Sequence, residues 1–318
     1  MPGRLLSLGS ISADFEMRVD RPPGEVETLP ARDLLRAGGG KAANVAVLAQ
    51  RLGCRAQLIG CVGDDDLAGQ ALDGPRAAGV DIAGVRRTRG HATGLSIVLV
   101  PPDGRKHIVA TSGANMACRE ADIHAFVQAV SAADRGDALV VDWEITALAA
   151  SRAVAAARDS GLRIVVDPSY PDAIDPADLR HVTAIAPNQS EAMILAGLGP
   201  GGADALEAAA QAIARMGPQT VCIKLDDGGC LAWHEGAAWH QASAPVDVLD
   251  ATGAGDAFTG ALAVALLEGR PPLDAVAFAV AAAELSVLTY GAQPSYPTRA
   301  ALEDRLRTVH RTVSRWRG

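Results

Sequence analysis

The sequence has little of what disulfide-stabilised, metal-binding or membrane proteins require. Its five cysteines are odd in number and include no CxxC pair, so they indicate neither a disulfide framework nor a zinc site. No uninterrupted apolar run is long enough to span a membrane, and the first ten residues lack the long apolar core of a signal peptide. We therefore expect a cytoplasmic protein with no membrane partner.

Basic and aromatic residues are also scarce. The chain has 29 Lys and Arg against 37 Asp and Glu, a formal net charge of −8. A nucleic-acid surface needs clustered Lys and Arg to neutralise the phosphate backbone, so no nucleic-acid partner is expected. Aromatic residues make up 3% of the chain, so aliphatic side chains and alanine must fill the core. Any phosphate group that binds to this chain must therefore be held by the residues of one local site and not by an extended basic surface.

What the chain does contain is VLDATGAGDAF, which joins glycines, a carboxylate and a helix start within eleven residues. Gly253 and Gly255 allow backbone conformations that a side chain disfavours, so successive N–H groups can converge on one anion. The apolar pattern from Ala257 to Glu268 predicts a helix whose positive end lies at the same place. Asp256 stands beside this anion site, where it can accept the proton of an attacking hydroxyl group. We expect a phosphoryl-transfer centre, with an acidic helix start that serves stability alone as the alternative.

A second glycine cluster, GGGKAANVA, also leads into an apolar helix. It places Lys41 and Asn44 near a helix N-terminus, where the hydroxyl groups of a ligand could approach the backbone closely. A dinucleotide fingerprint would need a buried strand just before the glycines, and residues 29–36 are too polar and contain proline, which disfavours a dehydrogenase. A P-loop would need Ser or Thr where this chain has Ala42.

Short apolar segments alternate with longer helical patterns, which predicts a parallel sheet covered by helices. Strands are expected at residues 5–8, 56–61, 138–141, 163–166, 184–186 and 220–223, and helices at 41–52, 67–78, 123–132, 147–159 and 203–216. The ligand site of such a sheet lies at the carboxyl ends of its strands. Asp14, Glu144, Asp167 and Asn188 follow predicted strands and are expected at that edge.

These residues resemble a known family. The segments LSLGSISAD, GGGKAANVA and DATGAGDAF occur in the order and spacing of the ribokinase-like, or PfkB-type, carbohydrate kinases, and shorter segments extend the resemblance over nearly the whole chain. The resemblance implies an α/β fold, a three-layer sandwich with a mostly parallel central sheet, in which residues 1–318 form one domain. It also implies a small β-sheet lid, built from segments near 15–36 and 80–110 and often shared in a homodimer.

The resemblance assigns roles to residues at matching positions. Asp256 would take the proton from a primary hydroxyl of a sugar as it attacks the γ-phosphate of ATP, while the backbone of Gly253, Ala254 and Gly255 holds the transferred group. The residues that would bind the sugar are Ser12, Asp14, Gly40, Lys41, Asn44 and Glu144, together with Asp256. An exposed loop acid is the alternative for Glu144.

The resemblance also implies a nucleotide site and two metal ions. Asn188 and Glu191 match an NxxE element that organises Mg²⁺ and the phosphates of ATP, and they also fit a capping box at a helix start. The other nucleotide positions are Lys224, Gly229 and Gly255, in a region where the acidic Asp226 and Asp227 depart from the family's turn. A monovalent cation, K⁺, would lie beside the anion site. Its matching positions are Asp250, Thr252, Ser286, Thr289, Gly291 and Ser295.

The acceptor stays open between several sugars. Ser12 stands where ribokinases typically have Asn, which removes one amide from the sugar site. Ribose is the first candidate, followed by fructose, a sugar phosphate or a nucleoside. A phosphosugar would need a basic patch in the lid, for which the candidates are Arg86, Arg87, Arg89, Arg105 and Lys106. A non-catalytic sugar-binding protein on the same fold is the alternative from another class.

Overall fold

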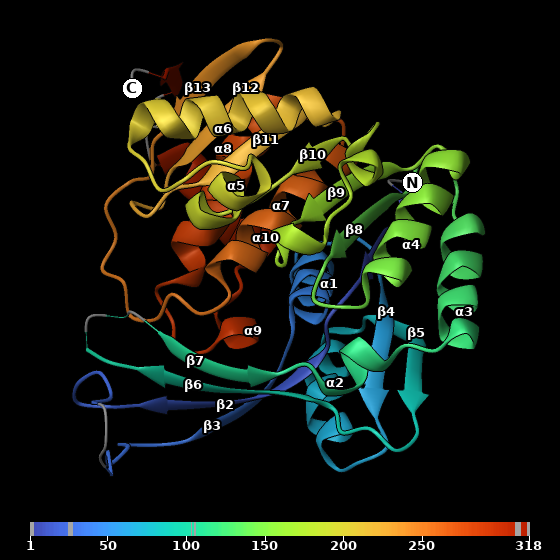
Figure 1. Cartoon of the computed structure of the whole chain (residues 1–318). Helices are drawn as coiled ribbons and strands as arrows, with labels where there is room; N and C mark the ends of the chain where they lie inside the picture. The colour runs from blue at the N-terminus through green and yellow to red at the C-terminus, as the bar shows by residue number, and fades with distance from the viewer. Residues whose placement is uncertain (1–2, 25–27, 103, 105, 309–312, 317–318) are drawn as a thin grey trace.

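The computed structural model describes residues 3–24, 28–102, 104, 106–308 and 313–316 (Figure 1). In these residues ten strands form one large sheet in the order β14-β13-β12-β11-β10-β9-β8-β1-β4-β5. Its parallel strands are β5 (Asp81–Thr88), β4 (Ala56–Gly63), β1 (Leu5–Leu8), β8 (Ala138–Asp142), β9 (Arg163–Asp167), β10 (Ala184–Ile185) and β11 (Thr220–Lys224). The antiparallel strands β12 (Cys230–His234), β13 (Ala237–Gln241) and β14 (Val313–Arg315) extend the other edge.

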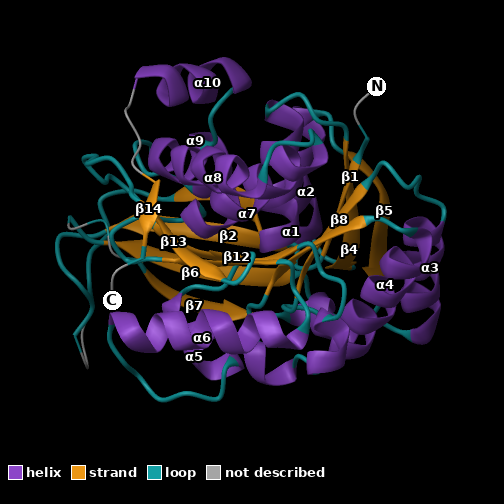
Figure 2. Ribbon diagram, turned by 90° about the horizontal axis from the view of Figure 1, so that it is seen from above, coloured by secondary structure: helices purple, strands orange, loops and turns teal. Residues whose placement is uncertain are grey.

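The central strands are buried on both faces, as their continuous apolar sequences require. Every residue of β1 and β8 is buried, because helices cover both sides of a parallel sheet. On one side lie α1 (Lys41–Arg51), α2 (Leu67–Ala78), α7 (Ala254–Leu267), α8 (Pro272–Ser286) and α10 (Arg299–Thr308), and on the other α3 (Glu120–Ser131), α4 (Ala147–Ser160), α5 (Gln189–Leu195) and α6 (Ala203–Met216) (Figure 2). Each side has its own apolar cluster, so the predicted three-layer α/β fold is confirmed.

A second, smaller sheet projects from the large one and forms the lid (Figure 1). Its strand order is β3-β2-β6-β7, with β2 (Ser12–Arg18), β3 (Leu35–Gly39), β6 (Gly94–Val100) and β7 (His107–Thr111). Residues 81–88, which the sequence analysis includes in the lid, instead form β5 and pair in parallel with β4. The two are hard to distinguish in sequence, because an edge strand of the large sheet is as exposed as a lid strand.

Helix α7 begins three residues earlier than predicted, at Ala254. Gly253 forms its N-cap with φ 76°, a left-handed conformation, and a Cβ there would lie 2.7 Å from both the Cβ of Ala292 and the hydroxyl of Tyr296. Gly255 lies inside the first turn and is not among the glycines with positive φ, so only Gly253 needs the conformational freedom expected of both. Asp256 therefore belongs to the first turn of α7. Among the described helices, none is long and apolar enough to cross a membrane.

Candidate active site

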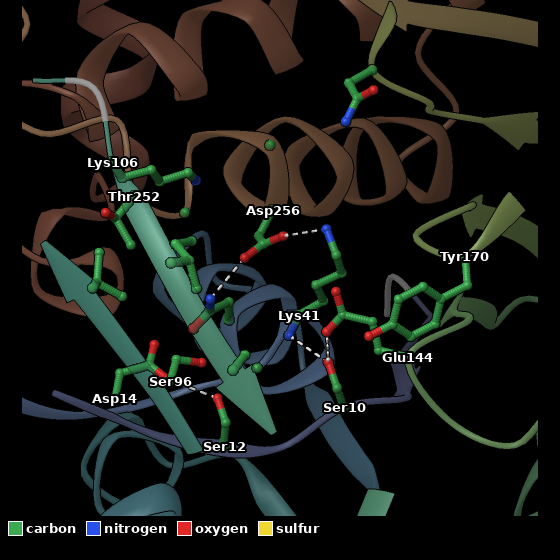
Figure 3. Close-up of a pocket in the computed structure, with 18 of the residues that line it drawn as sticks. Ser10, Ser12, Asp14, Lys41, Ser96, Lys106, Glu144, Tyr170, Thr252 and Asp256 are labelled. Carbon is green, nitrogen blue, oxygen red and sulfur yellow. Dashed lines mark hydrogen bonds and ion pairs between the residues drawn. The ribbon is translucent and has the colours of Figure 1, made fainter. Parts of the chain in front are cut away.

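A polar pocket of about 430 Å³ lies between the lid and the carboxyl ends of the parallel strands (Figure 3). It brings together most positions predicted from sequence. Those that line it are Ser12, Asp14, Gly40, Lys41, Asn44, Glu144, Asn188, Glu191, Lys224, Thr252, Gly253, Gly255 and Asp256. Ala254 and Gly229 do not line it. The lid and the following loops add residues that sequence analysis did not assign, among them Ser10, Ser96, Asn115 and Tyr170.

The lid side of the pocket is built around Asp14 of β2. Ser12 donates a hydrogen bond from Oγ to Asp14 Oδ1 at 2.8 Å. Burial raises the pKa of Asp14 above its usual value, and the hydrogen bonds from Ser12 and Ser96 offset this only in part. A Cβ on Gly39 of the adjacent strand would lie 1.9 Å from Asp14 Oδ2, so the carboxylate occupies space that only glycine leaves free. Asp14 is thus held in place, facing the pocket.

The start of α1 is linked to Glu144 through Ser10. The backbone N–H of Lys41 donates to Ser10 Oγ at 2.9 Å, and this hydroxyl donates to Glu144 Oε2 at 2.9 Å. Gly40, with φ 88°, makes the turn from β3 into α1. Burial raises the pKa of Glu144, although Lys41 acts in the opposite direction. Glu144 therefore faces the pocket and is not an exposed loop acid.

Asp256 lies in the first turn of α7 and is oriented from two sides. Its Oδ2 accepts a hydrogen bond from Asn44 Nδ2 at 2.7 Å, and its Oδ1 lies 3.7 Å from Lys41 Nζ. Asn44 is fixed in turn, because its Oδ1 accepts a hydrogen bond from Gln293 Nε2 at 3.0 Å. The first backbone N–H groups of a helix have no partner within it. The N–H group of Ala254 donates to the carbonyl oxygen of Ala251 at 3.4 Å, whereas Gly253 and Gly255 line the pocket directly beside this carboxylate, where their N–H groups can meet an anion. A base and an anion site thus share one end of the pocket.

Asp167, the last residue of β9, contacts two lysines and a threonine at the site. Lys224 Nζ lies 3.0 Å from its Oδ2 and Lys41 Nζ lies 3.4 Å from its Oδ1, while Thr259 Oγ1 donates to Oδ2 at 3.1 Å. Burial alone would raise the pKa of Asp167, but Lys224 and Lys41 outweigh it and hold the pKa well below its usual range. For Lys41 the effect of burial has the opposite sign: burial alone would lower its pKa. The negative charges of Asp167 and Asp256 outweigh this and raise the pKa of Lys41 well above its ordinary value. Asp167 thus helps to keep Lys41 charged while it also pairs with Lys224.

Of the predicted nucleotide positions, Asn188, Glu191, Lys224 and Gly255 line the pocket, whereas Gly229 does not. Asn188 and Glu191 form the predicted capping box: Asn188 Oδ1 accepts the N–H of Glu191, and Glu191 Oε2 accepts the N–H of Asn188, both at 2.8 Å. Lys224 pairs with Asp167 and not with the acidic turn that follows it. Gly229 donates its N–H to Asp227 Oδ1 at 2.8 Å inside that turn.

An adjoining hollow of about 490 Å³ lies between the β11–β12 turn and the segment 242–251. Leu225 and Asp226 line both this hollow and the main pocket, so the two lie side by side at the β11–β12 turn. Ala254, absent from the main pocket, lines this hollow. The arrangement offers an elongated molecule a path from the α7 N-terminus outward along the turn.

The predicted cation positions lie on the loop before α7 and on the segment from the end of α8 to the end of α9 (Ala292–Ser295), and Asp250 joins these two parts of the chain. Its Oδ1 accepts the N–H of Thr252 at 2.8 Å and its Oδ2 accepts the N–H of Gly291 at 2.9 Å. Thr252 Oγ1 is buried with no hydrogen-bond partner among the described residues. Ser286 and Ser295 are buried and donate to nearby carbonyl groups, whereas Thr289 is exposed. Oxygen donors and one unpartnered hydroxyl fit a cation that is bound by oxygen.

A buried acid that sequence analysis missed lies between the lid and these loops. Glu16 follows Asp14 on the same face of β2 and is 0% exposed. Neither of its carboxyl oxygens has a hydrogen-bond partner of normal geometry among the described residues. Burial, with the negative charges of Asp250 and Asp14, raises its pKa to about 8. At neutral pH this side chain is therefore mostly protonated.

Three of the five residues considered for a basic lid patch lie outside the lid. Arg86 and Arg87 belong to β5 and Arg89 follows it, so all three lie at the edge of the large sheet. Arg105 lies outside the described residues. Lys106, just before β7, does reach the pocket. It joins Lys41 and Lys224 there, and these three are the only lysines in the sequence.

Comparison with known proteins decides the family. Residues 3–299 match the family model described as pfkB family carbohydrate kinase. The chain belongs to this family. A ribokinase of Haemophilus influenzae is 31% identical over 295 residues, which cover 93% of this chain and 95% of that protein. A ribokinase of Mus musculus is 31% identical over 303 residues, covering 93% of this chain and 92% of that protein.

A solved structure agrees with the family assignment. The ribokinase of Arabidopsis thaliana, solved in complex with ribose and ATP, matches with a TM-score of 0.82 and 28% identity over 97% of this chain and 100% of that one. As a carbohydrate kinase of this family, the chain is a phosphotransferase that acts on an alcohol group. The phosphoryl-transfer centre predicted from the GAGD segment therefore has the fold and family it requires.

Proposed function

We propose that this kinase transfers the γ-phosphoryl group of ATP to a primary hydroxyl group of ribose. The observation that carries the proposal is the position of Asp256, in the first turn of α7 and at the end of a pocket lined by hydroxyl-binding groups. The ribokinases named above support ribose as the acceptor, and the ribose and ATP complex of the Arabidopsis thaliana protein supports ATP as the donor. Fructose, a sugar phosphate and a nucleoside are the alternative acceptors.

In the proposed reaction, Asp256 accepts the proton of the acceptor hydroxyl. The hydroxyl oxygen forms a bond to the γ-phosphorus, and the bond from that phosphorus to the bridging oxygen of ADP breaks. Backbone N–H groups of Gly253, Ala254 and Gly255 hold the transferred group, and such preorganised donors contribute roughly 2.7–4 kcal/mol each to transition-state stabilisation. Asn44 fixes the base by its hydrogen bond to Asp256 Oδ2.

The remaining pocket residues bind and orient the two substrates. We assign the sugar hydroxyls to Ser12, Asp14, Gly40, Lys41, Asn44 and Glu144, which line one half of the pocket. Asn188, Glu191 and Lys224 would face the phosphates of ATP, with Gly229 in the turn beside the nucleotide. Asn188 and Glu191 would also place Mg²⁺, which when bound neutralises charge on those phosphates.

We further propose that K⁺ binds the loops joined by Asp250. The unpartnered Thr252 hydroxyl and the buried carboxylate of Asp250 beside it support this, and order in the loop 250–256 would preorganise the anion site. The predicted ligands are Asp250, Thr252, Ser286, Thr289, Gly291 and Ser295, largely through backbone carbonyl groups. The ion itself would supply only positive charge and rigidity.

We also propose a cytoplasmic homodimer formed through the lid. Ile97 and Val109 are paired across β6 and β7, and their side chains are 38% and 74% exposed, so an apolar surface is available for a second copy. Dependence on ATP and five free cysteines support a reducing, ATP-containing compartment.

The test is an assay with ATP, MgCl₂ and a panel of ribose, fructose, fructose 6-phosphate and adenosine, with ADP and phosphorylated product measured separately. We expect ribose to have the highest kcat/KM. The matched variant is Asp256→Asn, which should lower kcat by about 10²- to 10⁴-fold, the usual contribution of a general base, with little effect on ribose binding. Ribose binding without turnover under any condition would instead favour the non-catalytic alternative, and an Asp256→Asn variant with normal turnover would refute the assigned base.

A further inference from the structure

The chain has 29 Lys and Arg residues, but only three of them are lysines, and all three line one pocket. All other basic residues are arginines. The two side chains are not equivalent, because Lys presents a compact ammonium ion on a flexible stem whereas Arg presents a wide planar fork. Because every lysine of the chain lines this pocket, we expect the pocket to need compact positive charges on flexible side chains.

Two of them already have carboxylate partners. Lys41 lies within ion-pair distance of Asp167 and Asp256, and Lys224 pairs with Asp167 at 3.0 Å. Lys106 differs, because no ion pair is formed by it among the described residues. Within the part of the chain that the structure describes, its Nζ has one hydrogen bond, to the backbone carbonyl oxygen of Ala251 at 3.4 Å. A carbonyl group neutralises none of the ammonium charge, so the charge of Lys106 remains available to an anion.

The position of Lys106 is set by the lid. It directly precedes β7, and the turn before it packs against the loop that leads into α7. There a Cβ on Gly104 would lie 3.0 Å from Val248 Cγ1, and Gly104 has φ 71°. Lys106 contacts this loop at Ala251, two residues before the N-cap of α7. In Figure 3 it lies beside Thr252, and Lys106 and Lys41 approach Asp256 from opposite sides.

We propose that Lys106 is a phosphoryl-binding residue, which extends from the lid over the α7 N-terminus and binds the γ-phosphoryl group of ATP opposite Lys41. The inference rests on the proposed ATP-dependent function of the same site. The three equatorial oxygens of a transferring phosphoryl group carry charge on all sides. Helix α7 meets this charge with backbone N–H groups, and Lys106 meets it from the lid, on the side of Asp256 that faces away from Lys41.

The test compares Lys106→Met, Lys106→Arg and, as a matched control, His107→Gln on the adjacent residue of β7. Isothermal titration with MgCl₂ measures the affinity for ADP and for the non-hydrolysable β,γ-imido analogue of ATP. We expect Lys106→Met to weaken binding of the analogue about tenfold and to leave ADP unchanged, because only the analogue has a γ-phosphoryl group. Lys106→Arg should recover part of the loss, and His107→Gln should match wild type for both nucleotides.

Kinetics provide a second measurement. Lys106→Met should lower kcat by roughly 10- to 100-fold. This is less than the loss of a fully buried donor would cause, because Lys106 is exposed and water partly screens its charge. A raised acceptor KM with unchanged affinity for both nucleotides would assign Lys106 to an anionic acceptor and overturn the proposal. Unchanged nucleotide affinities and kinetics would overturn it as well. The nucleotide titrations need no acceptor, so a failure of the ribose assignment would be recognised separately.

Discussion

Replacing Glu16 by Gln should make the protein more stable, and increasingly so as pH rises. Glu16 has a folded-state pKa of about 8 against an ordinary value of 4.5. Below pH 4.5 the carboxyl group is neutral in both states and contributes no pH dependence. Between these values the unfolded chain loses its proton while the folded chain keeps it, so stability falls as pH rises. Above about pH 8 both states are ionised and the full cost of the buried charge is present.

The magnitude follows from the difference between the two pKa values. At 1.36 kcal/mol per unit, the shift corresponds to about 5 kcal/mol at high pH, an upper limit because water that enters near the lid screens the charge. Gln keeps the shape of the side chain and cannot ionise. The variant should therefore match wild type within about 1 kcal/mol at pH 5, where Glu16 is neutral in the folded state, and exceed it by several kcal/mol at pH 9.

The assay is urea unfolding followed by circular dichroism, at five pH values from 5 to 9. Choline buffers without potassium or sodium keep a bound cation from lowering the pKa of Glu16. Glu235→Gln is the matched control, because it makes the same substitution at a side chain that is 87% exposed. If the difference in the free energy of unfolding between Glu16→Gln and wild type stays constant from pH 5 to 9, Glu16 does not titrate in this range. The raised pKa assigned to the buried Glu16 would then be wrong.

Three further changes test other parts of the structure. Gly39→Ala places a Cβ against the Asp14 carboxylate, so acceptor kcat/KM should fall by about 100-fold, the effect of a displacement near 1 Å, while ADP affinity measured by titration is unchanged. KCl should increase both the reaction rate and the melting temperature relative to NaCl. At a K⁺ concentration one hundred times its dissociation constant, binding should add about 2.7 kcal/mol to the free energy of unfolding. Equal rates and melting temperatures in the two salts would refute the cation site. Val109→Asp should convert a lid-mediated dimer to monomer in size-exclusion chromatography with light scattering, and a dimer that persists would place the interface elsewhere.

The large sheet and both glycine-rich helix starts could be predicted from sequence because their signals are local. Apolar runs such as that of β8 match the burial that they have in the fold. The Gly253 turn and the start of α1 are likewise encoded within a few neighbouring residues. The positions of Asp14 and Glu144 after predicted strands already indicated one edge of the sheet, and the family resemblance then gave them a role in binding a sugar.

The lid contributions could not be predicted because they depend on strand pairing. Ser96 faces Asp14 only because β6 pairs in parallel with β2 at that register, with more than seventy residues between them. Lys106 resembles any charged turn residue in sequence, and its place depends on packing between the lid and the loop before α7. Glu16 has the alternating pattern of an exposed strand, although the lid buries it against that loop.

The restriction of lysine to one pocket makes amine chemistry a selective reporter of this site. Reductive methylation with ¹³C-formaldehyde would give three side-chain resonances, all from groups around the pocket, besides that of the chain's amino terminus. Each resonance could be assigned by one substitution and followed during a ligand titration. The same restriction means that amine-coupling surfaces and lysine cross-linkers would attach the protein through its binding pocket, so immobilised samples need another attachment point.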